Sequence, residues 1–217
     1  MEATDQGLFT GFAARDSEVL RENVCTVIAG RVYECILHPL GFYFIRLAER
    51  GDSTIRLHYW PADHREKGTA ITPYHDHVWS LCSCVLAGAV ENVLLQVDSD
   101  EHGDFHMADI NQVGNVDQVI LASSRVRMRI RSSQTYRAGE FYEIPPRVFH
   151  YTNVLPNDAV LTVVQARVVV QGGPRTLMPV GSEGHTPSRD PIADSEEVLI
   201  EIRHLLNISG SKNGTLS

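Results

Sequence analysis

Apolar and polar residues alternate with a period of two along most of the middle of the chain, a pattern typical of half-buried β-strands. In the segment 54–60, TIRLHYW, the apolar residues Ile55, Leu57 and Tyr59 alternate with a second set that includes Arg56. Further β-type runs occupy residues 42–47, 81–86, 90–97, 118–121, 125–131, 142–153 and 159–170. The runs are short and are separated by turn residues, so the pattern predicts many short strands.

Two segments carry apolar residues at helical spacing instead. The first covers residues 16–31, where Asp16 and Ser17 are candidate caps ahead of the amphipathic run. The second covers residues 196–206 and begins within the sequence DSEE at 194–197, which is typical of a capping box. We therefore expect one helix before the strands and one after them.

The strand region is not interrupted by helices, which excludes alternating strand–helix units and predicts an antiparallel arrangement. We expect a mainly β protein, a single-domain jelly-roll β-barrel with flanking N- and C-terminal helices. The domain organisation is then a helical arm over residues 1–32, the barrel over 33–171, and a Gly/Pro-rich crossing with a helix and a disordered tail over 172–217. Inside the barrel, residues 98–115 are polar and contain glycine, so we expect a surface loop there.

The composition narrows the classes of function. With 43% hydrophobic and 21% charged residues, the 217-residue chain has the composition of an ordinary globular protein. Its net charge of −8 argues against nucleic-acid binding, because a phosphate backbone is bound by clustered Lys and Arg. No apolar run approaches the about 20 residues of a membrane helix, and the N-terminus lacks the features of a signal peptide. We expect no membrane contact and a cytoplasmic location, where cysteines stay reduced.

The residues that carry chemistry concentrate in two segments, 68–88 and 139–153. The first contains His-Asp-His, and because side chains two apart on a strand point to the same side, His75 and His77 can aim at one point. A transition metal needs three or more converging ligands. The second segment supplies a candidate third ligand, His150.

Together, these two segments resemble the paired sequence motifs of the cupin superfamily. The first motif has a glycine, His-x-His and a later glycine, and it is matched by Gly68, His75, His77 and Gly88. The second runs glycine, proline, glycine, histidine, asparagine, and it is matched by Gly139, Pro145, His150 and Asn153. Two departures concern the metal site. Leu81 and Cys82 occupy the positions of the usual glutamate ligand, and Arg147 replaces the second glycine of the second motif.

Three histidines without the glutamate resemble the iron site of cysteine dioxygenase and related thiol dioxygenases, which often carry a cysteine five residues after His-x-His. Cys82 stands at that distance from His77. The resemblance implies an Fe(II) site formed by His75, His77 and His150, and such a site would also take Ni, Cu, Co or Zn. It implies O₂ and a small thiol or amino acid as partners. Cupins also often form homodimers through sheet edges.

The same resemblance implies where the substrate is held. Arg46 lies near the position of the arginine that binds the substrate carboxylate in thiol dioxygenases. Counting forward from the third histidine brings Gln165 and Arg167 to pocket positions, which makes Arg167 a second candidate clamp and Gln165 a candidate catalytic residue. Tyr59 and Trp79 complete the expected substrate contacts.

Cys82 is the second candidate catalytic residue, and we expect it to line the pocket without binding the metal. On an unbroken strand Cys82 would point away from His75 and His77, because even and odd positions face opposite sides. Its place in the pocket therefore requires a β-bulge near residues 79–81.

The function that these observations predict is a non-haem Fe(II)-dependent dioxygenase that oxidises the thiol of cysteine or of a related small molecule. A role in specialised metabolism, on the way to a sulfinate or a sulfonamide, fits the same class. Two alternatives stay open: a metal-dependent cupin isomerase or lyase, in which the metal is a Lewis acid, and a cupin that binds a small molecule without catalysis. The jelly roll hosts many chemistries, so the fold alone does not choose between them.

Overall fold

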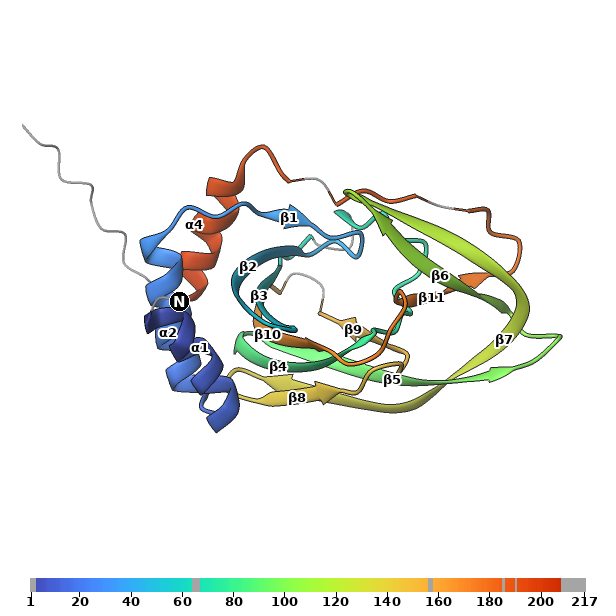
Figure 1. The fold of residues 1–217 in the computed structure, drawn as a ribbon, viewed down its shortest axis with the longest axis horizontal. Helices are drawn as coiled ribbons and strands as arrows, with labels where there is room; N and C mark the ends of the chain where they lie inside the picture. The colour runs from blue at the N-terminus through green and yellow to red at the C-terminus, as the bar shows by residue number, and fades with distance from the viewer. Residues whose placement is uncertain (1–2, 64–66, 156–157, 185, 190, 208–217) are drawn as a thin grey trace, which may run out of the picture.

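Two antiparallel β-sheets make up the centre of the protein (Figure 1). The computed structural model describes residues 3–63, 67–155, 158–184, 186–189 and 191–207. The six-stranded sheet has the order β1-β2-β3-β10-β4-β8, and the five-stranded sheet has the order β11-β6-β7-β5-β9. The mainly β fold expected from the sequence is confirmed, and the two antiparallel sheets are consistent with a jelly roll. The predicted disordered tail lies outside the described residues.

Most strands coincide with the alternating runs of the sequence, whereas β11 lies in the expected Gly/Pro-rich crossing, and β7 is much longer than the others. They are β1 (Ile36–Leu37), β2 (Tyr43–Arg50), β3 (Ser53–Trp60), β4 (Trp79–Ala87), β5 (Ala89–Ser99), β6 (Phe105–Val113), β7 (Val116–Arg137), β8 (Phe141–Ile144), β9 (His150–Asn153), β10 (Val160–Val168) and β11 (Arg175–Pro179).

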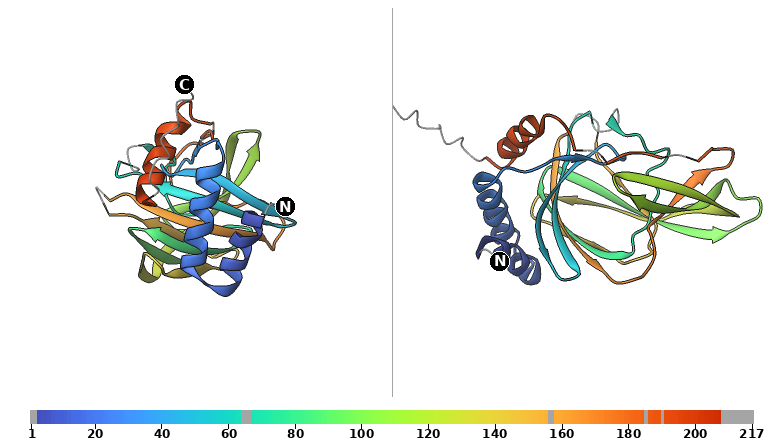
Figure 2. Two further views of the ribbon diagram at one scale, coloured as in Figure 1. Left: turned by 90° about the vertical axis from the view of Figure 1, so that its left-hand side faces the viewer. Right: turned by 45° about the horizontal axis from the view of Figure 1, so that its top comes forward.

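Three helices lie together at one end of the β-domain and pack on the outer face of the six-stranded sheet (Figures 1 and 2). They are α1 (Ala3–Ala14), α2 (Ser17–Gly30) and α4 (Ser195–Leu205). Asp16 caps α2 as expected, since its carboxylate accepts hydrogen bonds from two backbone N–H groups of the first turn. The expected capping box of α4 is wrong, because Asp194 makes no side-chain cap hydrogen bond. No helix of the described residues is long and apolar enough to cross a membrane.

The six-stranded sheet is buried on both faces, and each strand divides its side chains between them. On β3, the set formed by Ile55, Leu57 and Tyr59 packs under the helices. The alternate residues face the space between the two sheets, where Trp60 belongs to a second apolar cluster and Arg56 lies over aromatic rings of that cluster. Both faces of this sheet are therefore interior, because the helices cover its outer face.

The five-stranded sheet curls until a short segment, residues 74–77, joins its two edge strands. Within this ring-closing segment His75 pairs with His150 on one side and with Thr176 on the other. His75 N–H donates to the His150 carbonyl at 3.1 Å, and the His75 carbonyl accepts from His150 N–H at 2.9 Å. On the β11 side, Asp76 N–H donates to the Arg175 carbonyl at 2.9 Å. The segment thus completes a ring of strands with β11, β6, β7, β5 and β9.

Residues 98–115 are not the surface loop that their polarity predicts. β5 continues to Ser99, and β6 pairs with both β7 and β11. Phe105 and Met107 of β6 pack against a third apolar cluster, formed inside the ring, while most of the other β6 side chains are polar. A strand with one solvated face needs only every second residue to be apolar, so its composition can match that of a loop.

Arg147, in the turn between β8 and β9, has a positive φ of 64°. This conformation costs an L-residue about 1–2 kcal/mol and costs glycine very little. Glycine and alanine at this position both lose the guanidinium group, so the difference between them reports the backbone alone. We expect the free energy of unfolding of Arg147→Gly to exceed that of Arg147→Ala by about 1 kcal/mol in urea denaturation.

Arg129, an exposed residue of β7 outside the left-handed region, is the matched control. There the order should reverse, because glycine in a strand is destabilising by about 0.5–1 kcal/mol relative to alanine. An Arg147→Ala variant as stable as Arg147→Gly would contradict a strained backbone at Arg147.

Candidate metal centre

Three histidines from distant parts of the sequence meet between the two sheets. His75 and His77 come from the ring-closing segment, and His150 is the first residue of β9. Each offers a ring nitrogen, and these nitrogens lie within 4.8 Å of one another. The centroid of the His150 ring is 4.5 Å from that of His75 and 5.0 Å from that of His77, and the His75 and His77 rings are 4.7 Å apart. The predicted three-histidine cluster is present.

Backbone carbonyls fix the orientation of two of these rings. Nδ1 of His75 lies 2.8 Å from the Pro73 carbonyl oxygen, and Nδ1 of His150 lies 3.2 Å from the Val148 carbonyl oxygen. A carbonyl can only accept, so in both neutral rings Nδ1 carries the proton and Nε2 keeps a free lone pair. Nδ1 of His77 is buried and has no hydrogen-bond partner among the described residues.

Burial keeps all three imidazoles neutral. It lowers the pKa of His75 below the ordinary histidine value and lowers the pKa of His77 and His150 well below that value. For His77, the neighbouring His75 and His150 lower its pKa further, because a second positive charge beside them is unfavourable. Neutral imidazole is the form that binds metal.

The donor set fits a first-row transition metal. Metal-binding histidines usually donate their second ring N–H to a carbonyl or carboxylate, which is the arrangement of His75 and His150. Three imidazoles suit Fe, Co, Ni, Cu or Zn, whereas Mg and Ca prefer oxygen ligands. His75, His77 and His150 would hold the ion, and no carboxylate belongs to the cluster among the described residues.

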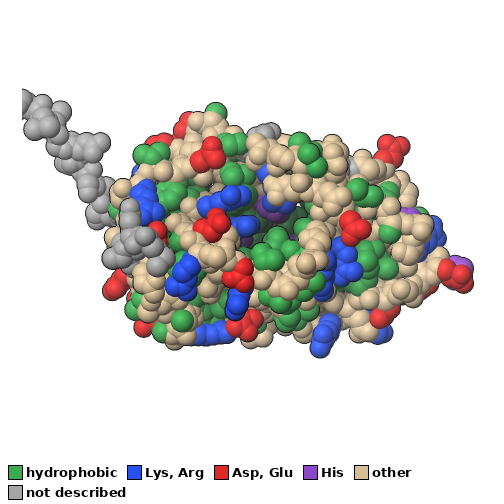
Figure 3. Space-filling model, viewed as in Figure 1, with side chains coloured by type: hydrophobic (Ala, Val, Ile, Leu, Met, Phe, Trp, Pro, Cys, Tyr) green, Lys and Arg blue, Asp and Glu red, His purple; other side chains and the backbone are tan. Residues whose placement is uncertain are grey.

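Figure 3 shows a hollow in this face of the molecule with histidine at its bottom and hydrophobic, Lys or Arg, and Asp or Glu side chains around it. Arg56 and His58 share one face of β3, and Arg56 lies over the ring of Trp79, which stacks on His77. His38 stacks on Phe42 at a centroid distance of 4.3 Å, and the Phe42 ring lies 4.7 Å from the ring of His58. Burial, followed by the charge of Arg56, lowers the pKa of His58 to about 3.

Arg56, His58 and His38 were not among the expected site residues, although the sequence contains a signal for two of them. Arg56 and His58 alternate with apolar residues and share their face of β3 with Trp60. A large aromatic residue on the polar face of a strand indicates that this face is buried too, and polar side chains there point into a cavity or a core.

Cys82 and Gln165 lie on the other face of the six-stranded sheet. The register between β4 and β10 runs without a shift from residue 79 to residue 84, so the bulge that would re-aim Cys82 is absent. Cys82 packs against the apolar cluster under the helices. Gln165 is paired directly with Cys82 and donates a hydrogen bond to Ser53 Oγ at 3.2 Å. Neither residue is brought to the three histidines, which corrects their expected place in the pocket.

Of the four expected substrate contacts, two lie on the cavity face of the six-stranded sheet and two do not reach the site. Trp79 lies beside the cluster, stacked on His77 at a centroid distance of 4.7 Å. Arg46 is paired with Arg56 across β2 and β3 and so lies on the cavity face, but its side chain is exposed. Arg167 is exposed and ion-paired with a neighbouring aspartate, and Tyr59 packs under the helices. These last two are not at the site.

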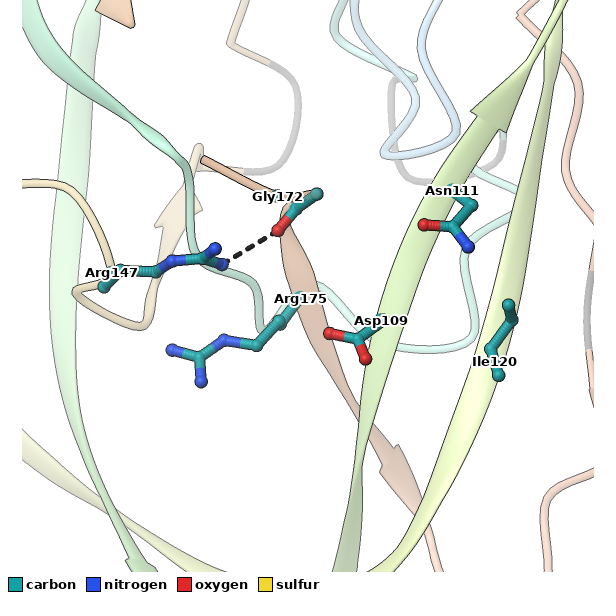
Figure 4. A pocket seen from close by; sticks show the side chains of 7 residues that line it. Asp109, Asn111, Ile120, Arg147, Gly172 and Arg175 are labelled. Atoms are coloured by element: carbon teal, nitrogen blue, oxygen red, sulfur yellow. Dashed lines mark hydrogen bonds between the residues drawn. The ribbon is translucent and has the colours of Figure 1, made fainter. Parts of the chain in front are cut away.

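A separate groove lies on the reverse side of the ring-closing segment (Figure 4). It is lined by Asp109, Asn111, Ile120, Arg147, Gly172, Gly173 and Arg175. Arg147 donates to the Gly173 carbonyl at 2.8 Å and to the Gln171 carbonyl at 3.0 Å, while Arg175 donates to the carboxylate of Asp76. Both guanidinium groups are thus engaged by the protein itself, which disfavours an anion site in this groove.

No protein-family model and no curated protein matches the sequence. The structure is similar to a cupin domain from Schizosaccharomyces pombe (9% identity, TM-score 0.32, 59% of this chain and 61% of that chain). It is also similar to a cupin-like protein from Thermotoga maritima (12% identity, TM-score 0.35, 65% of this chain and 79% of that chain). A third similar structure is that of the polyketide cyclase RemF from Streptomyces resistomycificus (14% identity, TM-score 0.39, 71% of this chain and 82% of that chain). The chain thus spans less than two thirds of the yeast domain. These values are too low to assign an activity, and we base the function on the geometry of the site.

The cluster predicts that His150→Ala removes most of the bound metal while the β-fold is retained, because two imidazoles alone do not hold a transition ion tightly. The measurement is metal content after purification without chelator, with circular dichroism to check the fold. His58→Ala is the matched control, since His58 lies in the same cavity but outside the cluster. Full metal occupancy in His150→Ala, or equal loss in His58→Ala, would show that the ligands are assigned wrongly.

Proposed function

We propose that this protein is a cupin-type metalloenzyme, a non-haem Fe(II)-dependent dioxygenase that oxidises the thiol of a small carboxylate such as cysteine. The observation that carries the proposal is the convergence of His75, His77 and His150 with two Nε2 lone pairs left free by backbone hydrogen bonds. A ferrous ion held by three neutral imidazoles supplies redox chemistry and keeps coordination positions open for small ligands.

The cavity supports an anionic substrate because Arg56 is a half-buried cation that has no ion-pair partner among the described residues. Its Nε is buried and makes no hydrogen bond among the described residues. Burial, and then the positive charge of Arg46, lowers the pKa of Arg56 to about 10, so the guanidinium remains charged at neutral pH. A buried charge is costly unless it is paired. A substrate carboxylate would supply the missing partner in a bidentate contact.

Aromatic side chains form the walls around this cation and support a small substrate held away from bulk water. The guanidinium carbon of Arg56 lies 5.8 Å from the ring centroids of both Phe44 and Trp79. Phe42 packs against Trp60 at a centroid distance of 4.4 Å. Apolar walls strengthen each polar contact that they enclose, because the local dielectric constant is low.

The thiol belongs to the substrate in this proposal, because no cysteine of the described residues reaches the cluster. Cys82 and Cys84 both pack under the helices on the far side of the six-stranded sheet. Thiolate is a soft ligand that suits iron, and His38 is available to hold a polar group of the substrate. Leu40 N–H donates to Nδ1 of His38 at 3.1 Å, so in the neutral ring Nε2 carries the proton and is a donor.

A second candidate function, a Lewis-acid isomerase or lyase, is favoured by one observation. His38 and His58 are histidines beyond the three ligands in the same cavity, and proton transfer between carbon and oxygen atoms needs such groups more than thiol oxidation does. Oxygen uptake across a panel of thiols, with metal-replete protein, separates the two: turnover without O₂ consumption supports the isomerase or lyase and contradicts the dioxygenase.

Arg56 provides the sharpest test of the substrate class. We expect Arg56→Gln to raise KM for cysteine about ten- to a hundredfold while leaving KM for cysteamine, which lacks the carboxylate, nearly unchanged. A lost charge-assisted contact costs about 1.5–3 kcal/mol, which corresponds to that range. Steady-state O₂ uptake gives both constants.

Two other arginines complete this comparison. Arg46→Gln, on the exposed rim of the same face, should have a smaller effect, and Arg167→Gln, outside the cavity, should have none. If Arg56→Gln treats cysteine and cysteamine as the wild-type protein does, the substrate carboxylate does not bind Arg56.

A further inference from the structure

Asp76 stands between two of the proposed metal ligands and points to the opposite side of the ring-closing segment. Side chains alternate along an extended segment, so His75 and His77 face the cavity while Asp76 faces the interior of the ring. Its carboxylate is fully buried, at 0% exposure. A buried carboxylate needs partners that satisfy its charge, and this one has arginines from two other elements.

Arg175, the first residue of β11, binds Asp76 through both backbone and side chain. Its N–H donates to Asp76 Oδ1 at 2.8 Å and its Nε donates to Oδ2 at 2.7 Å, while Nη2 lies 2.5 Å from Oδ2. In the other direction, Asp76 N–H donates to the Arg175 carbonyl at 2.9 Å. The segment with His75 and His77 is therefore held to β11 by four contacts at one residue pair.

Arg147 extends the network toward the third histidine. Its Nη1 lies 3.6 Å from Asp76 Oδ1, and its backbone N–H donates to the His77 carbonyl at 2.7 Å. Arg147 is three residues before His150, in the turn that leads into β9. The carboxylate of Asp76 thus contacts β11 through Arg175 and the turn before β9 through Arg147. His75 and His77 lie on the ring-closing segment, and His150 is the first residue of β9.

We propose that Asp76 and Arg175 are positioning residues of the metal centre, whose ion pair sets the spacing between the His75–His77 pair and His150 and thereby sets metal affinity. This inference rests on the proposed metal binding by the three histidines. The pair touches no ligand ring, so it acts through the backbone of the segment that carries two of them.

The physical reason lies in the tolerance of metal coordination. Metal–nitrogen distances vary by only about 0.2 Å between good sites, whereas a segment of four residues with backbone bonds on two sides can shift by more than that once its side-chain anchor is lost. Neutralising Asp76 also leaves the charge of Arg175 without its buried partner, which moves β11 relative to the segment. Mutating an outer contact of this kind typically lowers metal affinity about 10–100-fold.

The test uses cobalt(II) alone as the probe, because its visible absorption reports both binding and coordination geometry. Metal-free wild type, Asp76→Asn and Arg175→Lys are titrated with cobalt(II), and thermal unfolding of the metal-free proteins is recorded. Arg175→Lys keeps the positive charge and both backbone hydrogen bonds to Asp76 but loses the planar fork.

Asp117→Asn is the matched control. Asp117 is also a buried aspartate, at 3% exposure, and its carboxylate Oδ2 lies 2.7 Å from Nε and 2.6 Å from Nη2 of Arg189. Its described contacts do not include the ring-closing segment. Asp117→Asn therefore removes a similar buried ion pair, and lowers thermal stability, while the hydrogen bonds and ion pairs of the ring-closing segment stay in place. Arg189 lowers the pKa of His75 through its charge, and the substitution keeps that charge.

We expect Asp76→Asn to bind cobalt(II) about 10–100-fold more weakly than wild type, with an altered absorption spectrum at saturation. The Kd of Arg175→Lys should lie between those of Asp76→Asn and wild type. Asp117→Asn should keep the wild-type Kd and spectrum. Wild-type Kd and spectrum in Asp76→Asn, with a thermal shift like that of Asp117→Asn, would overturn the proposal and leave the pair a purely structural role. If Asp76→Asn does not fold, Arg175→Lys decides by the same comparison. Failure of wild type to bind cobalt(II), or unchanged binding in His150→Ala, would instead overturn the proposed function itself.

Discussion

The pairing of one residue, His75, with strands on both of its sides is the constraint on which the rest of the site depends. Its backbone bonds to His150 and its pairing with Thr176 turn an open five-stranded sheet into a ring. A residue held on both sides has no freedom to rotate about the chain axis. The period of two then places the imidazoles of His75 and His77 on one side of the ring wall and the carboxylate of Asp76 on the other.

The electrostatics of the two sides differ for this reason. On the cavity side lie three neutral imidazoles and the guanidinium of Arg56, for which the described part of the chain offers no ion pair. They leave an excess of positive potential that a metal dication would increase. We propose that an anionic substrate binds on that side. On the ring side, the carboxylate of Asp76 is paired with Arg175 and lies near Arg147, whose guanidinium also donates to a backbone carbonyl. We therefore propose ligand binding on the first side and support of the histidines by the second.

A buried ion pair is an expensive way to obtain stability, because desolvation of both charges offsets much of their attraction. The Asp76–Arg175 pair is better understood through the geometry that it specifies. Apolar side chains in the same place would bury comparable area but would allow the segment to slide along β11. Two charged groups with several directed hydrogen bonds have one low-energy arrangement, and the nearest structures that benefit are the histidines on either side of Asp76.

The sequence by itself determined the features that depend on neighbouring residues. Alternation located most of the strands but not β6, expected as a loop, or β11, expected as part of the Gly/Pro-rich crossing. Helical spacing and Asp16 located α2, and the two motifs identified His75, His77 and His150 as partners. Alternation also predicted that β3 has two sets of side chains on opposite faces, because that division depends only on neighbouring residues.

Which set faces the site was decided only by the tertiary structure. The helices cover one face of the six-stranded sheet, so both faces are interior, and a local pattern cannot distinguish a face under helices from a face over a cavity. Cys82, Gln165 and Tyr59 consequently lie under the helices, while Arg56 enters the cavity. Burial of a side chain by a segment more than a hundred residues away depends on how sheets and helices pack, and that information is not present in any single stretch of the chain.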